Sequence, residues 1–308
     1  MDQFLQTLKD GVTLGSLYAL IALGYTMVYG ILKFINFAHS DIVVLGAWLS
    51  LTAAAKIMEL LGVTDPPIWL GGVVLIGAMI GCGLIGFTVE RLAYKPLRGA
   101  PRLNVLITAI GVSLFLQNTG QLRPLFGTSP KRFPDLLSEV SLVQIGQVHL
   151  KLLDVVVIGT AIMFMVALEW LIYHTKIGRA MRAASHNIDV ASLMGVPVNR
   201  VISFTFILGS MLGAAGGFLW ALKYQTIKQP ADASWVLLGL KAFVAAVVGG
   251  IGNVHGAMLG GLAIGLIEQF GAAYLSSSMT NVYVFALLIL VLLVRPSGIL
   301  GKTTIEKV

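Results

Sequence analysis

The sequence predicts an all-α integral membrane protein, a polytopic bundle of about nine transmembrane helices (eight to ten), and two observations support this fold class. Hydrophobic residues occupy 57% of the 308 positions and charged residues only 11%, whereas about 25% of a soluble domain is charged. The mean hydropathy is +0.89. The apolar residues also come in runs of about 20, the length that crosses roughly 30 Å of hydrocarbon at 1.5 Å per residue. A soluble protein of this size could not bury so many long apolar segments.

The first apolar run, 11–32, is expected to be a permanent span. It is longer than the hydrophobic part of a secretory signal, and Asp2 and Asp10 offset the charge of Lys9. The nine predicted spans are 11–31, 41–61, 68–90, 103–121, 152–173, 201–222, 236–251, 256–275 and 282–294. The seventh and ninth are short for a crossing. Either flanking residues extend them or one is a re-entrant segment, which leaves eight spans as an alternative.

Lysine and arginine indicate the orientation. Basic segments follow the third, fifth and ninth spans, and with nine spans all three lie on one face, which the positive-inside rule makes cytoplasmic. Their basic residues are Arg91, Lys95, Arg98 and Arg102; Lys176, Arg179, Arg182 and Arg200; and Arg295, Lys302 and Lys307. The N-terminus is then outside and the C-terminus is in the cytoplasm. The loop 122–151 on the opposite face is also basic, but it is longer and contains Asp135 and Glu139.

The remaining composition narrows the function classes. The net charge of +7 lies in short loops and not in a patch with interleaved aromatic residues, so nucleic-acid binding is not expected. The single cysteine, Cys82, can form neither an intrachain disulfide nor a cysteine cluster for a metal. No linker divides 1–308, which we expect to be one membrane domain with 174–200 as a cytoplasmic loop. Two stretches, 17–46 and 237–261, weakly repeat one plan: an apolar helix, a polar break and a helix rich in small residues.

Glycine is frequent, at 35 positions, and several glycines are spaced four residues apart. This spacing puts them on one helix face, where they let a neighbouring backbone approach closely. The predicted packing faces are Gly77 with Gly81; Gly209 with Gly213 and Gly217; Gly256 with Gly260; and Gly261 with Gly265. The sequence therefore predicts a tight bundle, without distinguishing a transporter from a channel.

A polar segment, Asn36-Phe37-Ala38-His39-Ser40-Asp41, separates the first two spans. In one interpretation Ser40 or Asp41 is the N-cap of the second span. In the other, the break dips into the bundle, and Asn36, His39 and Asp41 line a gate or pathway. The two interpretations are compatible.

Other polar residues fall inside the predicted spans. Gln117 and Asn118 are further pathway candidates, because buried amides either bond neighbouring helices or line an aqueous route. Glu169 and Glu268 are close enough to predicted helix ends to reach interfacial water. Tyr25, on the first span, is interpreted as an interfacial anchor in preference to a pore-lining group.

The loop 174–200 is predicted to contain a short helix over 188–194. Asn187 or Asp189 is suited to begin this helix, and Gly195 is suited to the C′ position that ends it. Such a helix on the cytoplasmic face either rests on the membrane or docks a partner protein.

At this loop the chain resembles a known family. The segment Asn187-Ile-Asp-Val-Ala191-Ser-Leu193-Met-Gly195-Val-Pro-Val-Asn199-Arg200 resembles the cytoplasmic coupling loop of bacterial ABC importer permeases. Other segments resemble LivH-type high-affinity branched-chain amino-acid permeases: Gly11-Val-Thr-Leu-Gly-Ser-Leu-Tyr-Ala-Leu, Tyr25-Thr-Met-Val-Tyr-Gly, Ile35-Asn-Phe-Ala-His39, Lys241-Ala-Phe, Gly249-Gly-Ile-Gly and the tail that begins at Phe285. The resemblance covers nearly the whole chain and is weakest over 122–150.

The resemblance implies a permease subunit, not an enzyme, in the bacterial inner membrane. Its implied partners are a second homologous (LivM-like) permease, two cytoplasmic (LivG/LivF-like) ATPases and a periplasmic amino-acid-binding protein. The chain itself would bind no cofactor, since ATP and Mg²⁺ would be held by the ATPases. The cargo would be leucine, isoleucine or valine, with urea or other amino acids as alternatives. By position, the residues of the coupling loop are Asn187, Ala191, Leu193, Gly195 and Arg200, although Ile188-Asp189 stands where Glu-Ala occurs in other importers.

Two other function classes are weighed against this one. A stand-alone secondary carrier would need coupling-ion residues inside the spans, and the chain offers few charges there. A membrane-embedded enzyme would need a metal-binding His-Glu spacing, a Ser–His pair or a carboxylate dyad, and the sequence contains none of these patterns. It also contains no Walker A sequence, which agrees with ATP being handled by partners.

Overall fold

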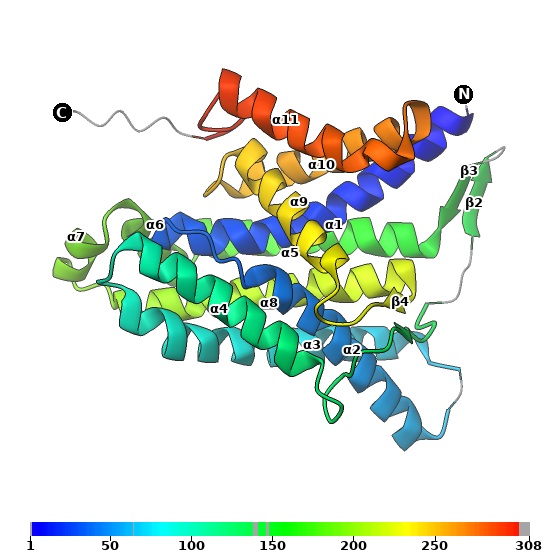
Figure 1. Ribbon diagram of the computed structural model, residues 1–308, viewed down its shortest axis with the longest axis horizontal. Coiled ribbons are helices and arrows are strands. Elements are labelled where there is room, and N and C mark those ends of the chain that lie inside the picture. Colours follow the sequence, from blue (N-terminus) through cyan, green and yellow to red (C-terminus); the bar gives the residue numbers. More distant parts are fainter. Residues whose placement is uncertain (1, 64, 138–140, 146–147, 302–308) are drawn as a thin grey trace.

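The computed structural model describes residues 2–63, 65–137, 141–145 and 148–301. Its helices are α1 (Asp2–Leu32), α2 (His39–Leu61), α3 (Ile68–Val89), η1 (Glu90–Tyr94), η2 (Lys95–Leu97), α4 (Arg102–Gly120), α5 (Leu152–His174), α6 (Lys176–His186), α7 (Ile188–Leu193), α8 (Val198–Tyr224), α9 (Ala233–Gly249), α10 (Val254–Tyr274), η3 (Ser277–Met279) and α11 (Thr280–Val294). Its strands are β1 (Lys131–Arg132), β2 (Ser141–Ile145), β3 (Val148–Lys151) and β4 (Thr226–Ile227). In Figure 1 the N-terminus and the β2–β3 hairpin lie at one end of the bundle, and α6 and α7 lie at the other. We call these the N-terminal end and the α7 end.

Eight helical segments of the described chain are long and apolar enough to cross a membrane. They are α1, α2, α3 with η1 and η2, α4, α5, α8, α10, and α11 with η3. The shorter apolar helix is α9, with 17 residues. The prediction of nine apolar helices is confirmed, and the two predicted to be short, the seventh and the ninth, are α9 with 17 residues and α11 with 15. The strands were not predicted: β1 pairs antiparallel with β4, and β2 pairs antiparallel with β3.

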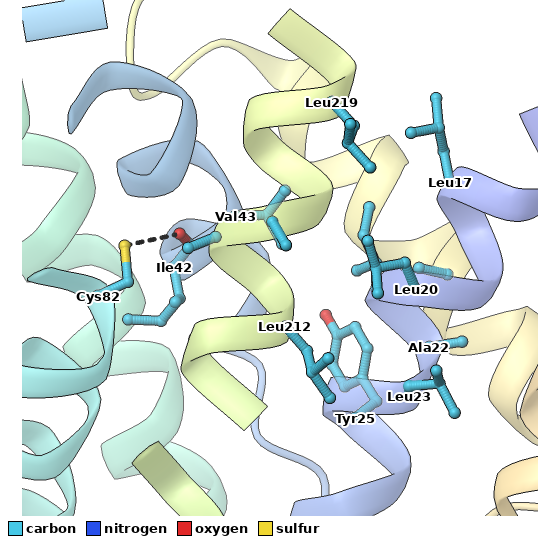
Figure 2. Close-up of a cluster of buried hydrophobic side chains, with 14 of the residues drawn as sticks. Leu17, Leu20, Ala22, Leu23, Tyr25, Ile42, Val43, Cys82, Leu212 and Leu219 are labelled. Atoms are coloured by element: carbon cyan, nitrogen blue, oxygen red, sulfur yellow. Dashed lines mark hydrogen bonds between the residues drawn. The ribbon is translucent and has the colours of Figure 1, made fainter. Parts of the chain in front are cut away.

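The core of the bundle is built around α1. All of its side chains from Thr13 to Val28 are buried, whereas α4, α5 and α11 bury only a few of theirs. Figure 2 shows Leu212 and Leu219 of α8 facing α1, and Cys82 of α3 on the other side of α2, with its Sγ 3.7 Å from the carbonyl oxygen of Ile42. The helices that wrap α1 therefore form the packed interior, and the outer helices present apolar surface outward, as a membrane protein requires.

Glycines on α8 set the closest approach of three helices. A Cβ added at Gly209 would lie 3.2 Å from the carbonyl oxygen of Gly24 on α1, and one at Gly213 would lie 3.0 Å from the His39 ring. A Cβ at Gly217 would overlap the backbone of α2. Because the backbones are this close, α8 is held tightly between α1 and α2.

Two glycine faces of α10 are used in the same way. Gly256 and Gly260 lie against the backbone of α9, and Gly261 and Gly265 lie against the backbone of α1. The four-residue spacing places each pair on one side of α10, so this helix joins α9 to the centre of the bundle.

The pairing of Gly77 with Gly81 as a packing face was wrong for this chain. No atom of another described helix lies within 4 Å of a Cβ added at Gly77, and at Gly81 only the side chain of Leu49 is near, at 3.3 Å. Gly81 therefore meets α2 through one side chain and Gly77 meets no other described helix, whereas Gly83 and Gly86 lie against α8. Spacing defines a helix face, but the tertiary packing decides whether anything covers it.

Charged residues inside the apolar helices are paired. Lys241 Nζ on α9 lies 2.6 Å from Glu268 Oε1 on α10, and the Tyr18 hydroxyl on α1 donates to Glu268 Oε2 at 2.8 Å. The expectation that Glu268 reaches interfacial water was therefore wrong. Glu169 is partly exposed and lies 3.0 Å from Nε2 of His255. The pairing of Glu268 offsets the cost of a charge in an apolar environment and fixes α9 to its neighbours.

The N-terminus of α9 is held by a side-chain cap. Asp232 Oδ1 accepts hydrogen bonds from the Ser234 hydroxyl at 2.6 Å and from the Ser234 N–H at 2.9 Å. These donors hold the pKa of Asp232 below its ordinary value. α9 therefore begins at a fixed point after the β4 strand instead of fraying.

The second predicted polar break lies against the end of α1. This break follows α9, and a Cβ added at Gly30, near the end of α1, would lie 3.8 Å from Cα of Gly252 within it. The chain after α11 packs on the same place, since the N–H of Leu300 donates to the carbonyl oxygen of Gly249 at 2.9 Å. The basic segments after the third and fifth predicted spans meet here too, because Arg98 donates a hydrogen bond to Asn199.

Candidate functional site

The break between α1 and α2 folds back into the bundle. His39, the first residue of α2, is 1% exposed, and its Nε2 lies 3.2 Å from the carbonyl oxygen of Ile21 on α1. Because α1 continues to Leu32, the chain returns roughly 16 Å along α1 before α2 begins, at 1.5 Å per residue. Of the two interpretations of this segment, the structure therefore has the re-entrant break. A helix that begins inside the bundle brings unpaired backbone N–H groups to that depth.

The other interpretation, a side-chain cap by Ser40 or Asp41, was wrong. α2 begins at His39, and the residue before it makes no side-chain cap. The N–H of His39 instead donates to the carbonyl oxygen of Asn36 at 3.1 Å, so the first turn forms earlier than the cap pattern indicates. This leaves the carboxylate of Asp41 in the first turn, free to reach another helix.

The buried polar residues of the break contact three helices. Asn36 Oδ1 accepts a hydrogen bond from the Tyr94 hydroxyl at 2.6 Å, and the His39 ring packs edge-on against the Tyr25 ring with centroids 4.5 Å apart. Tyr25 is only 5% exposed, so its interpretation as an interfacial anchor was wrong. Its place on α1 is opposite the break, where its ring supports His39.

Asp41 and Gln117 join α2 to α4. Asp41 is 4% exposed, and its Oδ1 accepts a hydrogen bond from Gln117 Nε2 at 2.9 Å. The Gln117 amide also donates to the Ser113 hydroxyl at 3.1 Å. Oδ2 of Asp41 accepts no hydrogen bond from the described residues. A buried carboxylate oxygen without a hydrogen-bond partner is energetically costly, so Asp41 is the position of the break that a further polar group would stabilise most. Within the described chain, no group of three or more His, Cys, Asp or Glu side chains could hold a metal ion.

Asn118 does not join this cluster. It is exposed, and its Nδ2 donates to the carbonyl oxygen of Leu114 on its own helix at 2.7 Å. Consecutive residues of a helix point about 100° apart, so only one of Gln117 and Asn118 can face α2. Four of the five predicted pathway residues thus gather at the break: Asn36, His39, Asp41 and Gln117.

The sequence reasoning missed a second buried group, built around Glu90. This residue is 0% exposed, pairs with the guanidinium of Arg98, and accepts a hydrogen bond from the Ser203 hydroxyl of α8 at 2.6 Å. It begins the π-helical segment η1, which ends at Tyr94. Single-turn π segments are rare and are frequent at functional sites. The sequence does carry a signal for this group, since Glu90 and Arg98 are eight residues apart at the end of the third predicted span. Only Arg98 was considered, as evidence for the orientation of the chain.

The loop 174–200 contains two helices, where one was predicted. The additional helix, α6, is amphipathic: it buries Gly178, Met181 and Ala184, which are three residues apart, and exposes its arginines. The Thr175 hydroxyl caps it by accepting from the N–H of Gly178 at 3.0 Å. A Cβ at Gly178 would overlap carbonyl oxygens at the end of α5, so glycine permits the sharp turn from α5 into α6.

The predicted ends of the short helix α7 are confirmed. Asn187 Oδ1 accepts from the N–H groups of Asp189 and Val190, each at 3.0 Å, which is an N-cap. At the other end, Gly195 has φ +81°, and the N–H of Val196 donates to the carbonyl oxygen of Ala191 at 3.0 Å. This is a Schellman C-cap, which glycine favours because its backbone is left-handed.

The predicted coupling residues divide into buried and exposed ones. Ala191 is 4% exposed, whereas Leu193 is 87% exposed and the neighbouring Met194 is 80% exposed. Arg200 is exposed on the first turn of α8. The α7 end therefore exposes two large apolar side chains on a segment with fixed caps. Figure 1 shows α7 lying beyond the ends of the long helices.

Comparisons with known proteins identify the family. A sequence model described as "Branched-chain amino acid transport system / permease component" matches residues 7–294. The chain is 42% identical to the high-affinity branched-chain amino acid transport system permease protein LivH of Salmonella typhimurium, over 99% of this chain and 98% of the relative. It is 41% identical to LivH of Escherichia coli K12 and 39% identical to BraD of Pseudomonas aeruginosa, over the same shares. No solved structure matches it.

The match spans all nine apolar helices, the polar break and the α6–α7 segment. It covers nearly the full length of both chains at close to 40% identity. The chain therefore belongs to the family of branched-chain amino acid transport system permeases.

Proposed function

We propose that this chain is a transmembrane permease subunit of an ATP-binding-cassette importer for branched-chain amino acids. The observation that carries the proposal is the α7 segment: Leu193 and Met194 are apolar and exposed, and a rigid connection joins them to α8. Exposed apolar side chains at a fixed position are typical of a docking surface. As a member of a transport permease family, the chain is a membrane transport subunit and not an enzyme.

The proposed assembly contains three kinds of partner. A second, homologous permease would complete the pathway, two ATPases would bind the α7 end and hold ATP and Mg²⁺, and a periplasmic binding protein would deliver the amino acid. The α7 end would then face the cytoplasm of the bacterial inner membrane and the N-terminal end would face outward. The positive-inside rule supports this orientation, because the basic segments of the chain meet at the α7 end.

The buried polar break is the proposed gate. α8 begins directly after α7, and its glycines contact His39 and the backbone of α2. Closure of the ATPases would displace α7, and α8 would carry that displacement to the break, where Asp41 holds α4 through Gln117. Opening of this contact would expose the free carboxylate oxygen of Asp41 to a passing substrate.

The proposal is tested with the assembled transporter. Replacement of Leu193 and Met194 by serine should reduce recovery of the ATPases with the purified permease about tenfold or more, a loss of ~1.4 kcal/mol of binding, and should abolish leucine uptake into proteoliposomes. The matched control is Leu275→Ser, a 76% exposed apolar residue after α10, which should change neither.

Two results would contradict the proposal. Unchanged ATPase binding by the double variant would remove the docking role of α7. Uptake by the purified chain alone, driven by an ion gradient, would indicate a secondary carrier. Uptake of urea instead of leucine by the complete assembly would leave the importer standing and correct its cargo.

A further inference from the structure

We propose that Glu90, Arg98 and Tyr94 form a relay that transmits movement of α7 to the polar break, so that ATP hydrolysis is coupled to opening of the gate. This inference rests on the proposed function and names the residues through which it is exerted. All three lie between the α8 N-terminus and the break, and none of them contacts the exposed tip of α7 in the described structure.

The first link joins α7 to α8 through a short connection. The backbone is hydrogen-bonded across it: the N–H of Val196 donates to Ala191 and the N–H of Val198 donates to Val196, at 3.0 and 2.8 Å. α8 then begins at Val198. With so few residues and a closed hydrogen-bond pattern, a shift of α7 moves the start of α8 with it.

The second link joins the start of α8 to Glu90. Ser203, in the second turn of α8, donates to Glu90 Oε2 at 2.6 Å, and Asn199, in the first turn, accepts from Arg98. Arg98 also pairs with Glu90. Glu90 and Arg98 therefore hold the N-terminus of α8 at two places one turn apart, which transmits rotation as well as translation.

The third link is the π-helical segment η1, which carries Glu90 at its first position and Tyr94 at its last. The backbone N–H of Lys95 donates to the carbonyl oxygen of Glu90, the five-residue spacing of a π turn. Tyr94 is 2% exposed, and its ring lies between Phe34 of the break and Phe206 of α8, with centroids 5.4 and 5.3 Å away. A displacement of Glu90 is thus passed to Tyr94 through a single helical turn.

The last link joins Tyr94 to the break. Its hydroxyl donates to Asn36 Oδ1 at 2.6 Å, and Asn36 is 7% exposed. Asn36 accepts from the N–H of His39, the residue that begins α2. From Glu90 onward the relay therefore reaches the start of α2 through side chains that are all buried: Glu90, Tyr94 and Asn36.

A buried ionic group is a costly way to join two helices, because apolar residues of the same volume often give equal or greater stability. Hydrogen bonds are directional, so those of Glu90 and Arg98 specify one relative position of η1 and α8, whereas apolar packing would let the two helices slide past each other. This property is what a coupling element needs.

The test measures coupling and not stability. The assembled transporter is reconstituted in proteoliposomes, and leucine imported per ATP hydrolysed is measured for Tyr94→Phe and Ser203→Ala, which each remove one hydroxyl from the relay. We expect the ratio to fall about fivefold in each variant, the factor that corresponds to one hydrogen bond of ~1 kcal/mol, while ATP hydrolysis persists. In the combined variant the ratio should fall no further than in the stronger single variant, because both changes interrupt one series.

The matched control is Tyr18→Phe, which removes a hydroxyl equally buried but bonded to Glu268 outside the relay, and its ratio should stay at the wild-type value. The relay is overturned if Tyr94→Phe and Ser203→Ala leave the ratio unchanged, if uptake and hydrolysis fall in proportion, or if Tyr18→Phe lowers the ratio equally. Absence of ATP-driven uptake by the wild-type assembly would instead contradict the proposed function.

Discussion

The ammonium group of Lys241 lies 2.6 Å from the carboxylate of Glu268, in the middle of two apolar helices. Each side chain is nearly buried, with about a tenth of its surface exposed. The pair holds α9 against α10, while Tyr18 adds a hydrogen bond from α1. Each charge of the pair has its counter-charge within hydrogen-bond distance, so the pair anchors α9 without leaving an unpaired charge between α9 and α10.

Removal of one partner of this pair should destabilise the protein more than removal of both. Lys241→Met leaves the Glu268 carboxylate without its cation and should cost about 3–5 kcal/mol, because an uncompensated charge stays buried. The combined variant Lys241→Met with Glu268→Leu should recover most of this loss. Thermal unfolding of the purified protein in detergent measures both. A combined variant less stable than Lys241→Met would show that the bond from Tyr18 to the Glu268 carboxylate contributes more than the ion pair with Lys241.

The Asp41–Gln117 contact should matter where the adjacent amide does not. Gln117→Leu removes the amide N–H that donates to the Asp41 carboxylate. The free energy of unfolding should fall by about 1–3 kcal/mol, the penalty for a buried polar group left unsatisfied. Asn118→Leu is the matched control, since Asn118 is exposed and bonds only to its own helix among the contacts described. Unfolding midpoints and leucine uptake are measured for both variants. An equal effect of the two changes would contradict the placing of Gln117 at the break.

Gly217 and Gly77 each have another glycine four residues away, but replacement by alanine should change the stability of the protein in opposite directions at the two positions. A methyl group at Gly217 would overlap the backbone of α2, so Gly217→Ala should force α8 from α2 and lower the recovery of folded protein. Gly77→Ala meets no other helix of the described chain and should stabilise α3 by up to ~1 kcal/mol, the difference in helix propensity. Fluorescence-detected gel filtration and thermal unfolding report both outcomes. Loss of folded protein from Gly77→Ala would place a neighbour against this face.

The caps of α7 should set its local stability. Asn187→Ala removes the acceptor of two backbone N–H groups and should cost about 1 kcal/mol, and Gly195→Ala should cost roughly as much because alanine is strained at φ +81°. Hydrogen exchange of residues 188–193 measures the opening of this helix. The control Ser185→Ala alters a hydroxyl of α6, outside the caps of α7, and should leave exchange in α7 unchanged. Faster exchange in that control would mean that α6 and α7 open as one unit.

Hydrophobic length alone was enough to locate the spans. Each apolar run predicted a helix that the structure contains, since a chain in lipid has no alternative to satisfying its own backbone hydrogen bonds. Local chemistry was equally sufficient at α7, because the Asn187 cap and the Gly195 terminator act within a few residues. The helix α6 in the same region was not predicted, because its buried face consists of only three residues, Gly178, Met181 and Ala184.

The polar break required the tertiary structure. Its residue types predicted either a helix cap or a pathway lining. The choice between them depended on whether the chain returns along α1 so that His39 contacts Ile21, and a local sequence pattern does not specify that contact. Gln117 and Asn118 are neighbouring amides with the same chemistry, so the sequence does not show which of them faces α2. The rotation of α4 about its axis decides this.

The sequence by itself determined the membrane fold, the nine apolar helices and the capped segment α7, because hydrophobic length and capping are local properties. The tertiary structure alone decided which glycines touch, that Asp41 meets Gln117, and that Glu90 joins Arg98 to Ser203. These are contacts between helices distant in sequence, and their existence depends on the rotation and depth of each helix, which no local pattern specifies.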